Sequence, residues 1–142
     1  MVVAGYLGTL GLMFEPFVRI CRKAFEPLVT QFGFREPEIA KLGRECFVRY
    51  HKGAATVSIA FEPGTTPIVE LFFPAGPGDS VVPWAERGGV AYARRLPLLR
   101  PSAKCSPAEP ELFAEYLAQS MAELAQAESK FLRASHSQTH AA

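Results

Sequence analysis

Apolar residues recur at steps of three and four along the first part of the chain, from about Phe14 to Phe32. The residues on this stripe are Phe14, Phe17, Val18, Cys21, Ala24, Phe25, Leu28, Val29 and Phe32. This spacing predicts an amphipathic helix with one core-facing side. Pro27 lies well inside the segment, where it removes a backbone donor and crowds the preceding turn, so we expect a kink or a break there. Gly33 directly follows the stripe and predicts the end of the helix.

Alternating apolar and polar residues then predict three strands, over residues 44–51, 54–61 and 67–73. Lys52-Gly53 is expected to form a tight hairpin turn, which gives an antiparallel meander. One face of this sheet is apolar and is expected to face the helices, with Cys46, Val48, Tyr50, Ala55, Val57, Ile59, Phe61, Val69, Leu71 and Phe73. The other face mixes polar and apolar residues: Arg49, His51, Thr56, Ser58 and Glu70 with Phe47, Ile68 and Phe72.

After the meander, residues 90–96 predict a short edge strand, and residues 97–107, which contain three prolines, predict an irregular connector. A second helix is expected to begin at Ser106-Pro107, or three residues later at Pro110, and to continue to about Arg133. The sequence therefore predicts a single α+β domain over residues 13–133. An N-terminal helix, a three- or four-stranded antiparallel meander and a C-terminal helix would pack on one sheet face.

The two ends of the chain differ from this domain. Residues 1–12 are apolar and uncharged, but too short for a membrane span of about twenty residues. They also lack the basic start of a secretory signal. We expect an apolar N-terminal extension, either native or upstream of a natural start at Met13; the alternative is a signal or anchor segment. The polar residues 134–142 predict a disordered tail.

Composition narrows the function classes. The chain has 142 residues, 49% of them hydrophobic, which is enough for one core without disulfides or metals. Its 15 basic and 14 acidic residues give a net charge of +1, so we expect no nucleic-acid binding. The cysteines, Cys21, Cys46 and Cys105, are odd in number and widely spaced, which argues against a metal site or a disulfide framework. We expect a cytoplasmic protein without a cofactor or metal.

The sequence contains no catalytic signature and favours a protein that is not an enzyme. Cys46 and His51 are five positions apart on one predicted strand, so their side chains would point to opposite faces. The polar-face candidates are Arg49, His51 and Glu70. We expect Glu70 to pair with Arg49 across the sheet, as a solvated structural pair and not as an acid–base site.

Protein binding has more support in the pattern. Phe47, Ile68 and Phe72 lie on the predicted face opposite the helices, and Trp84 lies in a short segment between loops. Exposed apolar patches usually mark interfaces, and aromatic residues are typical anchors. The alternative is that residues 1–12 or 81–96 fold over this face and make it core. If the face is open, we expect a protein partner or a second copy of the chain.

Two resemblances bear on function. A helix that ends in Gln31-Phe32-Gly33-Phe34, the strand Glu45-Cys46-Phe47-Val48-Arg49-Tyr50, a hairpin and a Leu/Phe-rich last helix resemble small uncharacterised bacterial α+β proteins. Some of those look like immunity proteins of toxin systems, which implies action by binding, with no site residue carried over. The resemblance covers residues 13–73 and 112–132. Arg95-Leu96-Pro97-Leu98 is similar instead to type III secretion chaperones, which form dimers and are acidic, unlike this chain.

A third alternative is a small enzyme or ligand-binding protein with a site near the loop of residues 74–89. A deep polar pocket there that contains Glu70, His51 or Arg87 with a shifted pKa would favour this alternative.

Overall fold

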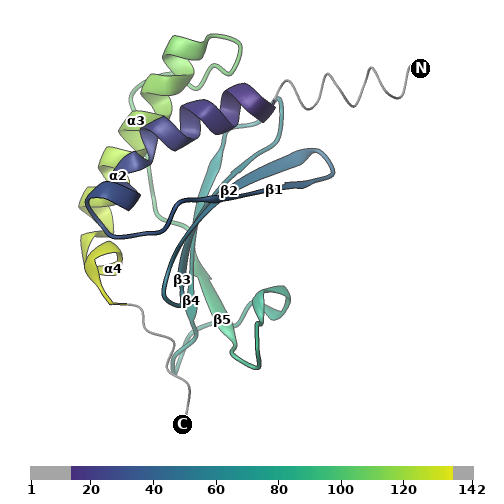
Figure 1. Cartoon of the computed structure of the whole chain (residues 1–142), viewed down its shortest axis with the longest axis vertical. Helices are drawn as coiled ribbons and strands as arrows, with labels where there is room; N and C mark the ends of the chain where they lie inside the picture. The colour runs from purple at the N-terminus through teal and green to yellow at the C-terminus, as the bar shows by residue number, and fades with distance from the viewer. Residues whose placement is uncertain (1–13, 136–142) are drawn as a thin grey trace.

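A five-stranded antiparallel sheet forms the centre of the protein (Figure 1), in a computed structural model that describes residues 14–135. The strands pair in chain order and are β1 (Glu38–Leu42), β2 (Glu45–Lys52), β3 (Ala55–Phe61), β4 (Ile68–Pro74) and β5 (Tyr92–Arg95). The predicted α+β class and antiparallel sheet are confirmed. The number of strands is five and not three or four, because β1 lies between the first helical segment and residues 44–51, where the sequence pattern predicted no strand. With five residues between Pro37 and Gly43, β1 offers too few positions to show a period of two.

Helices lie on one side of this twisted sheet (Figure 1). Residues 14–24 are helical, and they are followed by α2 (Glu26–Thr30), α3 (Pro110–Ala127) and α4 (Ser129–Arg133). The predicted break is confirmed and falls at Phe25, two residues before Pro27. A continuous helix would bring the Pro27 ring against the carbonyl one turn earlier, and ending the first helix before Phe25 removes that clash. Of the two predicted starts for the last helix, Pro110 is the observed one.

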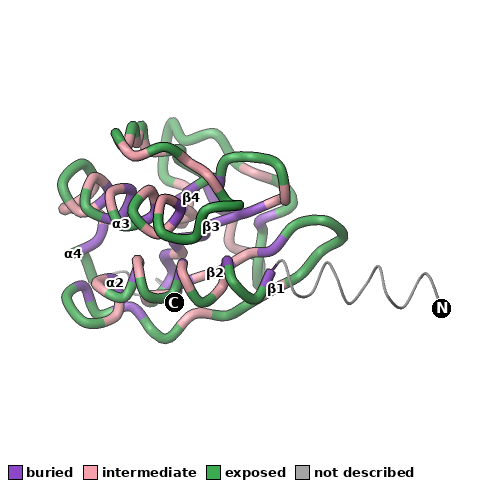
Figure 2. The backbone as a smooth tube through the Cα atoms, turned by 90° about the horizontal axis from the view of Figure 1, so that it is seen from above, coloured by how far each residue is buried: buried purple, intermediate pink, exposed green. Residues whose placement is uncertain are grey.

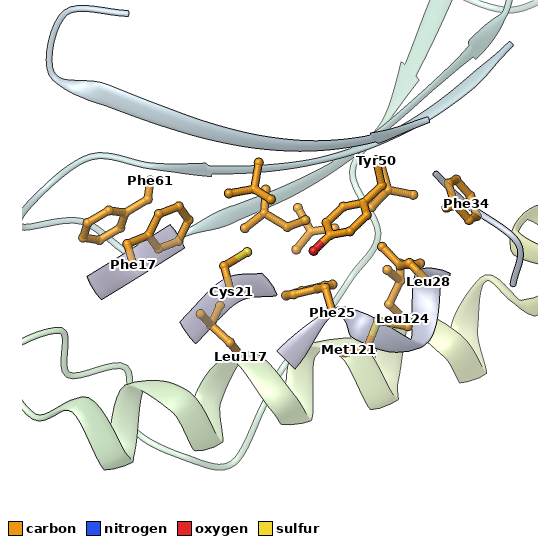
Figure 3. Close-up of a cluster of buried hydrophobic side chains, with 14 of the residues drawn as sticks. Phe17, Cys21, Phe25, Leu28, Phe34, Tyr50, Phe61, Leu117, Met121 and Leu124 are labelled. Carbon is orange, nitrogen blue, oxygen red and sulfur yellow. The ribbon is translucent and has the colours of Figure 1, made fainter. Parts of the chain in front are cut away.

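The core lies between the helices and the sheet, where Figure 2 shows the buried positions gathered. Phe17 stacks on Phe61 with their ring centroids 4.6 Å apart (Figure 3). Both rings also contact the ring of Phe113 in α3. The buried residues that the sheet contributes are Cys46, Val48, Tyr50, Val57, Ile59, Phe61, Val69 and Leu71. This set confirms the predicted helix-facing side of the sheet.

Tyr50 is the unusual member of this core. Its hydroxyl group points from β2 into the layer between sheet and helices (Figure 3). Within residues 14–135 it is the buried side-chain polar group without a hydrogen-bond partner. Burial, with a smaller contribution from Cys21, raises the pKa of Tyr50 well above its usual value. The hydroxyl is therefore a neutral group in an apolar layer.

The hairpin turns differ slightly from the prediction. Lys52 pairs with Ala55, so the tight turn between β2 and β3 is Gly53-Ala54, one residue later than expected. Gly53 has φ of +58° and Gly43, in the preceding turn, has φ of +60°. Glycine is the residue that adopts these angles without strain.

No helix within the described part of the chain is long and apolar enough to cross a membrane. The expectations for residues 1–12, and for the tail from residue 136 onward, concern segments outside the described residues.

Candidate functional site on the open face of the sheet

The side of the sheet that faces away from the helices, here called the open face, presents its side chains in cross-strand rows. The first row is apolar and consists of Ala40, Phe47, Ala60 and Ile68. The second row is polar and consists of Glu38, Arg49, Ser58 and Glu70. The third row combines polar groups with a ring and consists of His51, Thr56, Phe72 and Arg94. The character of the open face therefore changes along the strands.

The first row is open to solvent in part. Ile68 is 54% exposed, whereas Ala60 at the centre of the row is only 7% exposed, and Leu42 on the edge strand β1 is 60% exposed. Phe47 is partly buried, with the guanidinium group of Arg49 lying 4.6 Å from its ring centroid. Two of the predicted protein-binding residues, Phe47 and Ile68, thus lie on a sheet surface that no helix of residues 14–135 covers.

The other two predicted residues, Phe72 and Trp84, contact each other. Their rings meet edge to face, with centroids 5.6 Å apart, and Trp84 remains 67% exposed. Trp84 belongs to the short 3-10 helix η1 (Pro83–Ala85). Residues 81–91 are held beside β5, where the Val82 N–H donates to the Tyr92 carbonyl at 2.8 Å. This segment covers part of the third row but not the first row. The other cover that we considered, residues 1–12, lies outside the described residues.

The predicted ion pair between Glu70 and Arg49 is wrong. Glu70 instead pairs with Arg94 at 3.2 Å. The register explains this choice, because β3 with Ser58 stands between Arg49 and Glu70 in their row, whereas β5 is the direct neighbour of β4. Arg94 also lies 5.7 Å from the Trp84 ring and so connects that ring to the sheet.

A groove of about 520 Å³ opens at the third row. Its lining includes Arg35, Arg49, His51, Thr56, Trp84 and Arg87, and we call it the arginine groove. The three arginines come from the segment before β1, from β2 and from residues 81–91. None of them forms a side-chain ion pair with another residue in the described range 14–135. The groove therefore gathers three positive charges that form no salt bridge within residues 14–135, with Glu38 as the cross-strand neighbour of Arg49.

His51 is fixed in this groove by two contacts. Its Nδ1 lies 2.9 Å from Oγ1 of Thr56, and its backbone carbonyl accepts a hydrogen bond from the Arg35 N–H at 2.9 Å. Nε2 has no hydrogen-bond partner within residues 14–135. Burial lowers the pKa of His51; the Glu38 carboxylate opposes this change, and the nearby arginines add to it. The imidazole is therefore mostly neutral at pH 7.

The side chains that line the groove are of the kinds that bind an anion next to an apolar group. Guanidinium groups donate planar pairs of hydrogen bonds to oxyanions, and the rings of Trp84 and Phe72 offer apolar surface. Cys46 lies on the helix side of the sheet, so it cannot pair with His51. No group of three or more His, Cys, Asp or Glu side chains that could hold a metal occurs within the described residues.

Part of this site could be predicted from the sequence. His51, Arg49 and Arg87 stood out from their strand or loop positions. Arg35 did not, because it precedes Pro37 in a segment without regular alternation. The fold and this face define a small α+β protein with an antiparallel meander that helices cover on one side. Comparisons with protein-family models, curated proteins and solved structures found no match to this chain.

Proposed function

We propose that this protein is a non-catalytic protein-binding module, and that its open face binds an extended, acidic segment of a partner protein. The observation that carries this proposal is the arrangement of the arginine groove, whose three guanidinium groups form no ion pair within residues 14–135, beside an apolar row in which Ile68 is exposed. The resemblance to immunity-like proteins supports the same class and a bacterial cytoplasmic setting.

The apolar row supplies the part of an interface that excludes water. Ile68 is more than half exposed, and Leu42 and Trp84, which both line the arginine groove, are 60% and 67% exposed. Protein interfaces combine an apolar centre with tryptophan and arginine anchors. The open face brings both kinds of group together on one rigid sheet.

The distance between the first and third rows indicates how far apart the apolar and acidic side chains of the partner segment should be. Phe47 in the first row and His51 in the third are four residues apart on β2, which corresponds to about 13 Å of extended chain. An extended partner segment places side chains at i and i+4 on the same side. We therefore expect an apolar residue four positions from one or two acidic residues.

Charge favours an acidic protein segment over a nucleic acid. Glu38 and Glu70 lie in the second row of the same face, between the apolar row and the groove. A phosphate backbone that followed the strands would meet both carboxylates, whereas an acidic group confined to the groove would meet only Glu38, where three arginines outnumber it. The positive charge is local and suits a local acidic group.

The test uses a short extended peptide with two glutamates four positions from a phenylalanine. Trp84 is the single tryptophan of the chain, so its fluorescence reports binding at the groove. We expect saturable binding, at least tenfold weaker for a peptide with glutamines in place of the glutamates. Ile68→Ser should weaken binding, whereas Leu98→Ser should not, although Leu98 is 75% exposed in the connector. Equal binding of both peptides, or no binding of either, would contradict the proposal.

One observation favours a second candidate, a small-ligand-binding protein. The arginine groove contains His51 and Arg87, and the pKa of His51 is lowered, as we expected for a ligand site near residues 74–89. Glu70 is paired with Arg94 and is not among the residues that line the groove. Calorimetric titration with small carboxylates, compared with the peptide, separates the two candidates, because a ligand-binding protein would prefer the small molecule.

A further inference from the structure

We propose that the arginine groove contains a carboxylate subsite, in which one carboxylate is held by the guanidinium groups of Arg35, Arg49 and Arg87 and by Nε2 of His51. The carboxylate is that of a partner's acidic side chain, so this inference rests on the proposed function and names the group that the partner inserts. When the carboxylate binds, the His51 imidazole takes up one proton from solvent, so that both ring nitrogens carry a hydrogen and Nε2–H donates a hydrogen bond to the carboxylate.

The convergence of three arginines is the first argument. They belong to three separate segments, yet they line one groove of about 520 Å³. Like charges gathered in one concave site repel each other, and the described residues supply no carboxylate that pairs with any of the three. An external anion removes this repulsion and receives planar, charge-assisted hydrogen bonds.

The fixed position of His51 is the second argument. Because Nδ1 faces Thr56 Oγ1 at 2.9 Å, Nε2 is the nitrogen that remains for a ligand. The Arg35 N–H that donates to the His51 carbonyl holds the backbone of these two residues together. The imidazole of His51 is therefore held in place by the sheet, so Nε2 can receive a carboxylate without a rearrangement of the strands.

The charges around His51 explain why carboxylate binding should favour protonation of the imidazole. Glu38 on β1 favours the protonated imidazole, whereas Arg87 from residues 81–91, Arg35 before β1 and Arg49 on β2 disfavour it. Thr56 on β3 carries no charge. A bound carboxylate offsets the three arginines and adds an acceptor for Nε2–H, so protonation becomes easier in the complex than in the free protein. By linkage, the affinity for the carboxylate increases as the pH falls.

The experiment uses the full chain with benzoate as the probe, at constant ionic strength, followed by Trp84 fluorescence and by NMR of the His51 imidazole. His51→Gln identifies the His51 signals. We expect the affinity for benzoate to increase about fivefold to tenfold between pH 8 and pH 6, within the tenfold per pH unit that one proton permits. The titration midpoint of His51 should rise when benzoate binds.

Matched variants locate the subsite. Arg87→Gln and Arg49→Gln should each weaken benzoate binding at least fivefold, whereas Lys104→Gln, which removes an exposed cation from the connector, should leave it unchanged. His51→Gln should retain weaker binding without the pH dependence. Arg87 lies in a loop at the surface, so its replacement preserves the core and keeps the test valid.

Three results would overturn the subsite: affinity unchanged in Arg87→Gln, a His51 midpoint that does not move, or tighter binding of inorganic phosphate than of benzoate. If benzoate fails while the glutamate peptide still binds through Ile68, the proposed function stands and the subsite is wrong. If benzoate binds as expected and the peptide does not, the subsite stands and the proposed function fails.

Discussion

The same substitution on the two sides of the sheet tests whether the open face is free to bind. Ile59 on β3 is fully buried under the helices, whereas Ile68 on β4 is 54% exposed in the first row of the open face. Alanine at either position removes the same atoms from a strand. The difference between the two losses in the free energy of unfolding therefore measures what covers each side chain.

The structure sets the expected sizes. Removing a fully buried isoleucine side chain to alanine costs about 2–5 kcal/mol, because transfer free energy is lost and a cavity remains. Full burial of an isoleucine contributes roughly 1.5–3 kcal/mol. Since Ile68 keeps more than half of its surface in water and leaves no closed cavity, we expect about 1 kcal/mol for Ile68→Ala and about 3 kcal/mol or more for Ile59→Ala.

Urea unfolding, followed by Trp84 fluorescence and far-ultraviolet circular dichroism, measures both values. With a denaturant slope of roughly 2 kcal/mol per molar urea, the midpoint should fall by about 1.5 M for Ile59→Ala and by about 0.5 M for Ile68→Ala. Equal shifts would refute the reasoning, because they would mean that Ile68 is packed inside the folded protein. The first row could then not bind a partner.

Three further predictions concern single groups. Lowering the pH from about 6.5 should reduce the free energy of unfolding, measured in urea, more for the wild type than for His51→Gln. The pKa of His51 is lowered in the folded protein, so the unfolded chain binds a proton more readily as the pH falls. The same pH dependence of the unfolding free energy in both proteins would contradict this. Tyr50→Phe should change thermal stability little or raise it by up to about 1 kcal/mol, because the buried hydroxyl has no hydrogen-bond partner; a clear loss would argue against that environment. Gly43→Ala should cost about 1–2 kcal/mol by denaturant midpoint, since φ is +60°, and Gly43→Asn should cost less.

Much of the fold follows from local pattern. The stripe from Phe14 to Phe32 and the strict alternation of residues 46–50 and 57–61 place their side chains without knowledge of the rest of the chain. A helix face or strand face is set by the 3.6- or 2-residue period alone, so these assignments hold once the elements form. The break near Pro27 is local for the same reason, since proline acts on the turn that precedes it.

The site depends on neighbours that the sequence does not reveal. Glu70 pairs with Arg94 and not with Arg49 because of the order of strands β2 to β5, which is a tertiary property. The arginine groove forms because Arg35, Arg49 and Arg87 arrive from segments that are far apart along the chain. No spacing rule connects them, and Arg35 in particular follows no period.

The helix layer is assembled from both ends of the chain, which has a consequence for folding during synthesis. Phe17 of the first helix contacts Phe113 of α3 with ring centroids 6.2 Å apart. All five strands lie between these two residues in the sequence, so they are synthesised before Phe113. Strands that are neighbours in sequence pair early, whereas contacts between distant segments form late. A nascent chain that has reached the connector can therefore hold a paired sheet whose Val48, Ile59 and Leu71 still lack α3. On the ribosome, this exposed surface is where a chaperone would be needed, until translation passes Ala127.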